Sequence, residues 1–365
     1  MIKVKDILKE LEQYAPLPLQ EDYDNAGVQV GDVDQLATGA LVCLDVTEEV
    51  LNEAIEKECN LIISHHPLVF KPFKSLKGNT YIERCLIKAC KHDIVIYAAH
   101  TNLDNVQGGV NYRLAEMIGL QNVRILSPQK NALLKLVTFV PESHEELMRS
   151  TLFNAGAGSI GNYDSCSFNT QGSGTFRANE EANPFCGEVG ELHTEKEVRI
   201  ETVLPTYKKG AVTRALLSVH PYEEPVFDFY LLNNSWDQAG SGVVGELPEA
   251  EDELVFLQRI KELFRVECIK HSDLTGKQIR EVALCGGSGA FLIKDAISYG
   301  VDVFITGEAK YNDFYDVEDH ILLAVIGHYE SELCTKDIFY TILSKKFPTF
   351  ALYKSGLDRN PVNYL

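Results

Sequence analysis

Apolar runs of strand length alternate with helix-like stretches along the first third of the chain. The runs cover residues 41–44, 61–63 and 94–99. Apolar positions spaced three or four apart follow each run: first Val50, Leu51, Ala54 and Ile55, then Ile82, Leu86 and Ala89, then Val110, Leu114 and Met117. Strand and helix in strict alternation predict a parallel sheet with crossover helices.

The last third repeats this pattern. A run at 282–285 leads into the turn 286–289 and a helix-like stretch with Phe291, Leu292 and Ala296. Further runs cover 303–305 and 321–326, and a closing helix is marked by Phe339, Ile342 and Leu343. We therefore expect both ends of the chain to form α/β structure.

The middle of the chain has a different order of elements. Strands are predicted at 134–140, 198–204 and 226–232, helices at 143–154 and 207–219, and a Gly/Ser-rich hairpin at 156–176. This βαββαβ order is the split, ferredoxin-like unit. Linker-like segments at 126–128 and 233–242 flank it. We predict an α/β core formed by 1–125 and 238–365, interrupted by an inserted α+β domain at 126–237.

Polar residues follow the apolar runs of the α/β segments at regular places. They are Asp45, His65, His66, His100, Asp104, the turn Gly286, Gly287, Ser288 and Gly289, then Glu308, His328 and Glu332. In parallel α/β sheets, ligands bind beyond the carboxyl ends of the strands. These residues are therefore expected to converge on one crevice.

The histidines and carboxylates among them favour a metal site. His65 and His66 precede Pro67 at a strand end, where both rings can approach one site and each can bind one of two neighbouring cations. His328 and Glu332 are spaced i, i+4, which places them on one helix face and lets the carboxylate bridge. Each pair alone is also compatible with a loop, a cap or a solvated face. Three such groups at consecutive strand ends, counting His100 with Asp104, favour metal binding.

The types of side chain in the predicted site narrow the choice of metal ion. Histidine with carboxylate and no cysteine suits Zn, Mn, Fe, Co or Ni better than magnesium. The turn Gly286–Gly289 presents backbone N–H groups to an anion such as phosphate, or is simply a tight strand–helix turn.

Composition excludes several classes of protein. The 365 residues carry 53 acidic and 34 basic side chains, a net charge of −19, which disfavours binding to duplex nucleic acid. The charged N-terminus does not resemble a signal peptide, and no apolar run approaches the ~18 residues of a membrane span. Nine cysteines without a CxxC pair are typical of reduced, buried thiols. A cytoplasmic protein without a membrane partner is expected.

Six segments resemble the Nif-three-like family, also called the GTP cyclohydrolase I type 2 homologs. They are Asp24-Asn25-Ala26-Gly27-Val28-Gln29-Val30-Gly31, Ser64-His65-His66-Pro67-Leu68, Ala99-His100-Thr101-Asn102-Leu103-Asp104, Cys285-Gly286-Gly287-Ser288-Gly289, Thr306-Gly307-Glu308-Ala309-Lys310-Tyr311 and Gly327-His328-Tyr329-Glu330-Ser331-Glu332. His220-Pro221-Tyr222-Glu223-Glu224-Pro225 resembles the inserted, PII- and CutA-like module of the longer bacterial members. The resemblance implies a layered α/β core with parallel-type sheets around this insert.

The resemblance also implies ligands and an assembly. Two divalent ions per chain would be held by His65, His66, Asp104, His328 and Glu332, the residues that the strand-end pattern selects. Members form toroidal homohexamers with the metal sites facing an internal cavity. Tyr23 stands where many members have Trp, a difference expected to matter only for packing, and Asn312 stands where many have His.

Three functions follow from this interpretation. The family name implies hydrolytic opening of the guanine imidazole ring of GTP by metal-activated water, with loss of formate. His100 is then the proposed proton shuttle and the turn Gly286–Gly289 the phosphate site. The alternatives are a two-metal phosphoesterase and a non-catalytic, metal-binding or regulatory hexameric scaffold.

Overall fold

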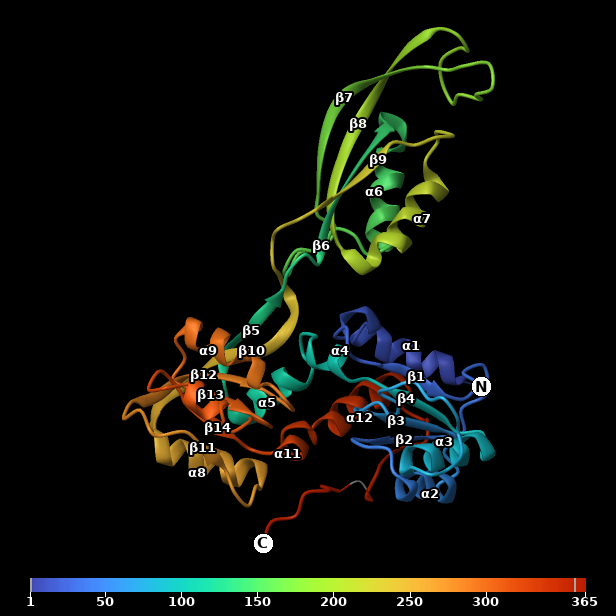
Figure 1. Ribbon diagram of the computed structural model, residues 1–365. Coiled ribbons are helices and arrows are strands. Elements are labelled where there is room, and N and C mark those ends of the chain that lie inside the picture. The colour runs from blue at the N-terminus through green and yellow to red at the C-terminus, as the bar shows by residue number, and fades with distance from the viewer. Residues whose placement is uncertain (1, 358) are drawn as a thin grey trace. The chain divides into compact units, whose positions relative to one another are not determined.

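The computed structural model describes residues 2–357 and 359–365. The chain divides into two compact units, one formed by Met1–Ser127 with Ala239–Leu365 and the other by Pro128–Gln238. The larger unit thus contains both the blue N-terminal and the red C-terminal parts of the chain, while the green-to-yellow middle forms the inserted unit (Figure 1).

The first sheet of the larger unit is parallel except at one edge. In spatial order its strands are β1 (Gly27–Val30), β4 (Val95–Ala98), β3 (Leu61–Ser64), β2 (Ala40–Cys43) and β15 (Leu352–Lys354). Strands β15, β2, β3 and β4 are parallel, as predicted for the three that carry apolar runs, whereas β1 pairs antiparallel with β4. The pattern does not reveal β1 because its four residues include Gly27 and Gln29.

The second sheet departs further from the predicted parallel type. Its order is β11 (Lys270–His271), β14 (Leu322–Val325), β13 (Val303–Thr306), β12 (Gln278–Cys285), β10 (Trp236–Asp252) and β5 (Gln121–Gln129). The strands predicted from apolar runs, β12, β13 and β14, are parallel, but β10 and β11 pair antiparallel with β12 and β14. Both sheets are therefore mixed. Strands β10 and β11 contain no long apolar run, so the sequence pattern gives no sign of them.

Helices cover both faces of these sheets. They are α1 (Val4–Tyr14), α2 (Glu48–Glu56), α3 (Tyr81–Lys91), α5 (Val110–Ile118), α8 (Glu253–Phe264), α9 (Ile293–Tyr299) and α12 (Thr335–Lys346). Helices α2 and α3 begin after Thr47 and Thr80, whose side chains accept hydrogen bonds from first-turn N–H groups. Short helical turns are η1 (Leu17–Leu19), α4 (Thr101–Asp104), η4 (Ala290–Leu292), α10 (Asp313–Asp316) and α11 (His328–Glu332).

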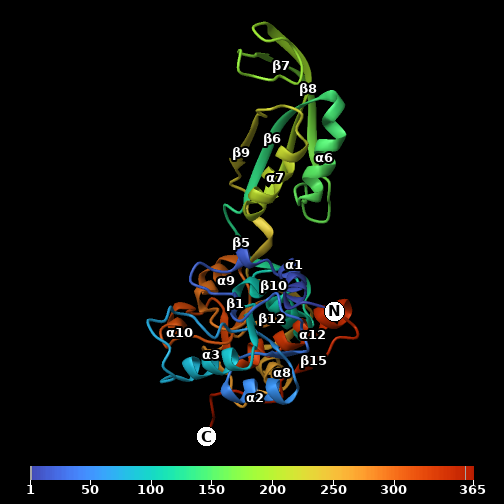
Figure 2. The same cartoon turned by 90° about the vertical axis from the view of Figure 1, so that its right-hand side faces the viewer.

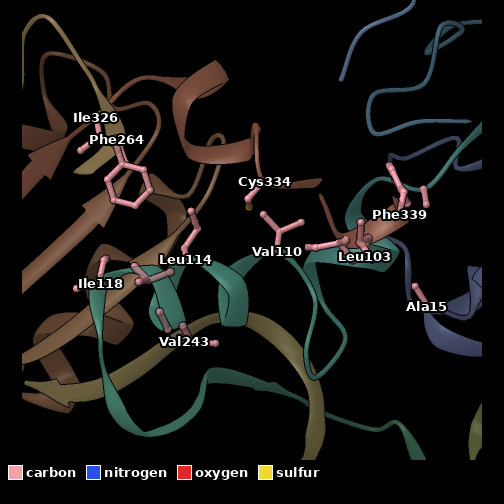
Figure 3. Close-up of a cluster of buried hydrophobic side chains, with 14 of the residues drawn as sticks. Ala15, Leu103, Val110, Leu114, Ile118, Val243, Phe264, Ile326, Cys334 and Phe339 are labelled. Carbon is pink, nitrogen blue, oxygen red and sulfur yellow. The ribbon is translucent and has the colours of Figure 1, made fainter. Parts of the chain in front are cut away.

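One apolar cluster connects the two sheets. It contains Tyr97 of the first sheet, Leu284 of the second, and Leu114 of α5 between them. Figure 3 shows it running from Leu103 and Phe339, past α5, to Phe264 and Ile326. Because the cluster is continuous, the sheets form one body whose strand ends hold fixed positions relative to one another.

The inserted unit is an antiparallel sheet with two helices. Its elements are β6 (Leu133–Pro141), η2 (Glu142–His144), α6 (Glu145–Asn154), β7 (Ser167–Arg177), β8 (Leu192–Pro205), η3 (Thr206–Lys208), α7 (Lys209–Val219) and β9 (Phe227–Leu231), and the strand order is β7-β8-β6-β9. This is the predicted βαββαβ order. Helices α6 and α7 lie on one face of the sheet, where Leu152, Ile200 and Leu216 pack together (Figures 1 and 2).

The prediction of a hairpin within 156–176 is wrong, because the strand in that segment pairs with a strand that follows it. That segment supplies only β7, which pairs along its whole length with β8, from Ser167 opposite Thr202 to Arg177 opposite Leu192. The turn of the hairpin is therefore the segment 178–191. Strand β8 begins six residues before the predicted 198 because polar residues occupy its first part.

No helix in the described part of the chain is long and apolar enough to cross a membrane.

Candidate metal centre

The five predicted metal ligands come together at the strand ends of the two sheets. His65 and His66 directly follow β3, and Asp104 ends α4, which follows β4. His328 and Glu332 are the first and last residues of α11, which follows β14. Because β3 and β4 belong to one sheet and β14 to the other, the site depends on the packing between the sheets.

The Glu332 carboxylate lies between two sets of side chains. Its Oε2 is 2.9 Å from Nε2 of His66 and 3.0 Å from Nε2 of His328. Its Oε1 is 3.7 Å from Nε2 of His65, which in turn is 3.7 Å from Oδ1 of Asp104. One oxygen thus faces His66 and His328, and the other faces His65. This arrangement suits a carboxylate shared by two cations.

His65 presents an unpaired ring nitrogen to this site. Its Nδ1 donates to the carbonyl of Ala99 at 2.9 Å, so Nε2 carries the lone pair. That Nε2 is buried without a hydrogen-bond partner. Burial lowers the pKa of His65 and keeps the ring neutral. A buried acceptor facing two carboxylates calls for a cation between them, and the donor set therefore fits a bound metal ion.

Two further carboxylates orient the other histidines. Asp45 lies 2.8 Å from Nδ1 of His66, and Glu308 lies 3.2 Å from Nδ1 of His328. Each therefore fixes the tautomer that turns Nε2 toward Glu332, as outer carboxylates do at metal-bound histidines. Although burial opposes the charged ring, hydrogen bonds to Asp45 and Glu332 raise the pKa of His66 to about 10. The pocket thus attracts positive charge.

The two inward carboxylates differ in charge state. Burial would raise the pKa of Glu332, but hydrogen bonds from His328 and His66 hold it well below its usual range. Burial and the neighbouring Glu332 raise the pKa of Asp104. Two carboxylates this close repel each other unless a cation lies between them, which again suits a metal site.

Known proteins resemble this chain over most or all of its length. The family described as Duf34/NIF3 (NGG1p interacting factor 3) matches residues 2–361. The chain belongs to the Duf34/NIF3 family. The GTP cyclohydrolase 1 type 2 homolog of Bacillus subtilis is 37% identical over 370 residues, covering 99% of this chain and 98% of that protein. The homolog of Halalkalibacterium halodurans is 40% identical over 324 residues, 88% of this chain and 87% of that protein.

Solved structures show the same fold over the whole chain. A Bacillus cereus protein related to NIF3 superposes with a TM-score of 0.85 at 34% identity, covering 100% of this chain and 99% of that one. A Staphylococcus aureus protein gives a TM-score of 0.79 at 32% identity with the same coverage. The family resemblance found in the sequence is therefore confirmed.

His100 of this Duf34/NIF3 chain lies beside the ligands and is held by a residue that the strand-end pattern missed. Its ring centroid is 5.2 Å from that of His65 and 5.5 Å from that of His66. Its Nδ1 is 2.9 Å from Oδ1 of Asp24, whose other oxygen, Oδ2, accepts from the backbone N–H of Thr101 at 3.0 Å. Burial alone would raise the pKa of Asp24, but the hydrogen bonds from His100 and Thr101 lower it to about 2.

The glycine turn positions Glu332 and offers little to an anion. The backbone N–H groups of Gly286, Gly287 and Gly289 donate to Asn111, Ser331 and Thr306 at 2.9, 2.9 and 3.0 Å. Ser288 donates its hydroxyl to Glu308 at 2.6 Å. These contacts oppose the predicted phosphate site, because the three N–H groups are already used within the protein.

Gly287 has a specific role in this turn. Its φ is +60°, and an added Cβ would collide with Oε1 of Glu332. Glycine therefore allows the turn to pass directly beside the shared carboxylate.

A cavity of about 610 Å³ opens over the ligands. Aromatic side chains line its mouth: Tyr23, Phe70, Phe73, Tyr81 and Phe291. The Phe70 ring stands edge-on to His100 with 5.6 Å between centroids. Tyr23 is 69% exposed, so it contributes to the cavity wall and not, as expected from the sequence, to packing alone. Asn312 directly precedes the short helix α10 and does not line the cavity.

Proposed function

We propose that this protein is a dinuclear, metal-dependent hydrolase of the GTP cyclohydrolase I type 2 homolog kind. The observation that carries the proposal is the division of the Glu332 carboxylate between His66 with His328 on one oxygen and His65 with Asp104 on the other. The unpaired, buried Nε2 of His65 supports it independently.

Two divalent ions are proposed per chain, chosen from Zn, Mn, Fe, Co and Ni. His66 and His328 would hold one ion, His65 and Asp104 the other, and Glu332 both. Bound there, such ions supply Lewis-acid chemistry, which lowers the pKa of water toward neutrality and polarises the bond under attack.

His100 is the proposed proton carrier of the site. Asp24 fixes the ring so that Nδ1 bears the proton and Nε2 is directed away from Asp24. A histidine held in one tautomer beside the ligands can accept a proton from the attacking water and deliver it to the leaving nitrogen. Asp24 stabilises the charged ring while the proton is held, as a positioning residue.

The proposed substrate is GTP, and the proposed reaction opens its imidazole ring with loss of formate. The names of the relatives support this choice. The aromatic rim of the cavity supports it as well, since Phe70, Phe73 and Phe291 offer flat apolar surfaces on which a purine can stack.

The assembly and the insert are proposed from the same resemblance. We propose a toroidal homohexamer, for which the mass of the protein in solution is the test. The inserted unit is proposed to be a PII/CutA-like module, and its βαββαβ order with the sheet order β7-β8-β6-β9 supports this.

The test is a turnover assay on the protein loaded separately with each candidate metal. Formate release and loss of guanine absorbance from GTP are expected. His100→Asn is expected to lower kcat by about 10²–10⁴-fold while retaining the metal content. His320→Asn is the matched control, because His320 is an exposed histidine of the same unit.

Other results would overturn the proposal in distinct ways. Release of phosphate from GTP or from nucleotide esters would indicate a two-metal phosphoesterase. A metal-loaded protein that turns over none of these substrates would favour a binding or regulatory scaffold.

A further inference from the structure

A second cluster of metal-ligating side chains lies in the inserted unit, and the proposed function does not use it. It consists of Cys186, His193 and Glu195, whose ligand atoms all lie within 4.8 Å of one another. The sequence pattern predicts core packing for all nine cysteines, but Cys186 is only partly buried, unlike the five cysteines in the cores. Core packing therefore does not explain the position of Cys186.

The hairpin β7–β8 builds this cluster from one strand face. His193 and Glu195 are two residues apart on β8, so they point to the same side of the sheet. That side is opposite to Val198 and Ile200, which face the helices. Glu195 pairs across the sheet with Gly174, which carries no side chain to cover it.

The turn of the hairpin brings the thiol back onto this face. Gly187 has φ +78°, and an added Cβ would approach His193 to 2.8 Å. Glycine next to Cys186 therefore lets the backbone pass close to the histidine ring. Asn183 in the same turn donates its N–H to Glu223 at 2.8 Å, which fastens the turn to the segment after α7.

The His220–Pro225 motif holds that segment in place. Nε2 of His220 donates to the carbonyl of Phe139 at 2.9 Å, and its Nδ1 accepts from the N–H of Tyr222 at 3.1 Å. Tyr222 in turn donates its hydroxyl to Glu197 at 2.7 Å and contacts the thiol of Cys186. The motif therefore holds Tyr222 in contact with the thiol of Cys186.

Within the cluster, one carboxylate serves two proton donors. Glu195 Oε2 is 2.9 Å from Nε2 of His193 and also interacts with the Cys186 thiol. Hydrogen bonds from His193 and Cys186 lower the pKa of Glu195. Burial and the neighbouring Glu195 raise the pKa of Cys186, so the thiol keeps its proton in this state. A divalent cation would displace the thiol proton to solvent and bind His193 as a neutral imidazole, so that all three groups serve as ligands.

We propose that Cys186, His193 and Glu195 form a binding site for a borderline-soft divalent cation, with Zn²⁺ as the preferred ion. Thiolate, imidazole and carboxylate are the three ligand types of protein zinc sites, whereas Mg²⁺ and Ca²⁺ take oxygen ligands. Bound zinc would tie the turn 178–191 to β8. The site is separate from the histidine and carboxylate centre of the larger unit and does not depend on its activity.

Cobalt(II) is the probe that separates the two sites. Only a thiolate ligand gives the near-ultraviolet sulfur-to-cobalt charge-transfer band, and none of the five proposed ligands of the larger unit contains sulfur. Titration of the full chain with Co²⁺ is expected to produce this band, and excess Zn²⁺ is expected to abolish it.

Substitutions show which residues give rise to the charge-transfer band. Cys186→Ser is expected to lose it and Glu195→Gln to weaken Co²⁺ binding by roughly 10–100-fold. Cys166→Ser is the matched control, because Cys166 is a partly buried cysteine of the same unit outside the cluster. Glu332→Gln is expected to retain the band. A band that survives Cys186→Ser, or that never forms, would overturn the proposal.

A second measurement follows the turn itself. Amide hydrogen exchange of residues 179–191 is expected to slow when Zn²⁺ is added to the wild-type chain and to stay unchanged in Cys186→Ser. Equal protection in the two proteins would place the ion elsewhere and reject the site.

Discussion

The larger unit and the inserted unit bring metal-ligating side chains together from different parts of their sheets. In the larger unit, apolar clusters cover both faces of each sheet, and the proposed polar ligands follow the ends of strands. In the inserted unit, helices cover one face, and His193 and Glu195 stand on the other. Burial on both faces thus directs function to the ends of strands, while a half-covered sheet can build a site on its open face.

The largest expected effect tests the shared carboxylate of the larger unit. Glu332→Ala should lose both ions, or nearly so, because each carboxylate oxygen faces a different set of ligands. Asp104→Ala should retain about one ion, because Asp104 faces only the His65 set. Metal content per chain, with circular dichroism to verify folding, is the measurement.

The inserted unit provides the control for this comparison. The charge-transfer band of Co²⁺ at Cys186 should be unchanged in both variants. Equal metal content in Glu332→Ala and Asp104→Ala would show that Glu332 is not shared between two ions.

The proposed strand-end ligands were predictable because they follow apolar runs. His65 and His66 directly follow β3, and His328 follows the run that forms β14. Asp24 was accessible only through the family segment that contains it. It lies 76 residues from His100, and no apolar run precedes it. The contacts that oppose a phosphate site at the glycine turn were hidden for a similar reason, since the partners of its N–H groups include Asn111, 175 residues away.

The open-face cluster could not be predicted from the pattern at all. Polar residues alternating along an exposed strand are ordinary surface composition. The six residues between Cys186 and His193 form no metal motif, and the two meet only because the turn 178–191 folds back over β8. The edge strands were missed for the related reason that strands such as β1 and β11 carry no apolar run.

A core substitution of intermediate effect tests whether the two units are stabilised separately. Leu152→Ala removes a fully buried side chain from the inserted unit and should lower its free energy of unfolding by about 2–5 kcal/mol. The apolar cluster that contains Leu152 includes only residues of the inserted unit. Thermal unfolding by calorimetry should therefore show the inserted unit melting earlier and the larger unit unchanged.

The matched control lies on the same helix. Leu147 is 50% exposed, and Leu147→Ala should change stability by no more than about 0.5 kcal/mol. If Leu152→Ala shifts the unfolding of the whole chain as one transition, the cores are coupled and the separation of the units is wrong.

The smallest expected effect compares a buried carboxylate of the larger unit with a partly buried one of the inserted unit. The side chain of Asp24 is fully buried, and its pKa of about 2 lies below the value near 4 of an unfolded chain. A depressed pKa contributes stability above the unfolded pKa and loses it as the pH falls through the folded one. Asp24→Asn should therefore lower the free energy of unfolding by about 1–3 kcal/mol at pH 7. The difference from wild type should shrink as the pH falls from about 4 toward 2.

Glu195→Gln, the comparison in the inserted unit, should change the free energy of unfolding little across this whole pH range. The reason is that the pair between Glu195 and His193 is partly solvated. Chemical denaturation from pH 7 down to the lowest pH at which wild type folds measures both differences. A constant difference for Asp24→Asn across that range would mean that its charge does not stabilise the site, and that the amide serves His100 and Thr101 equally well.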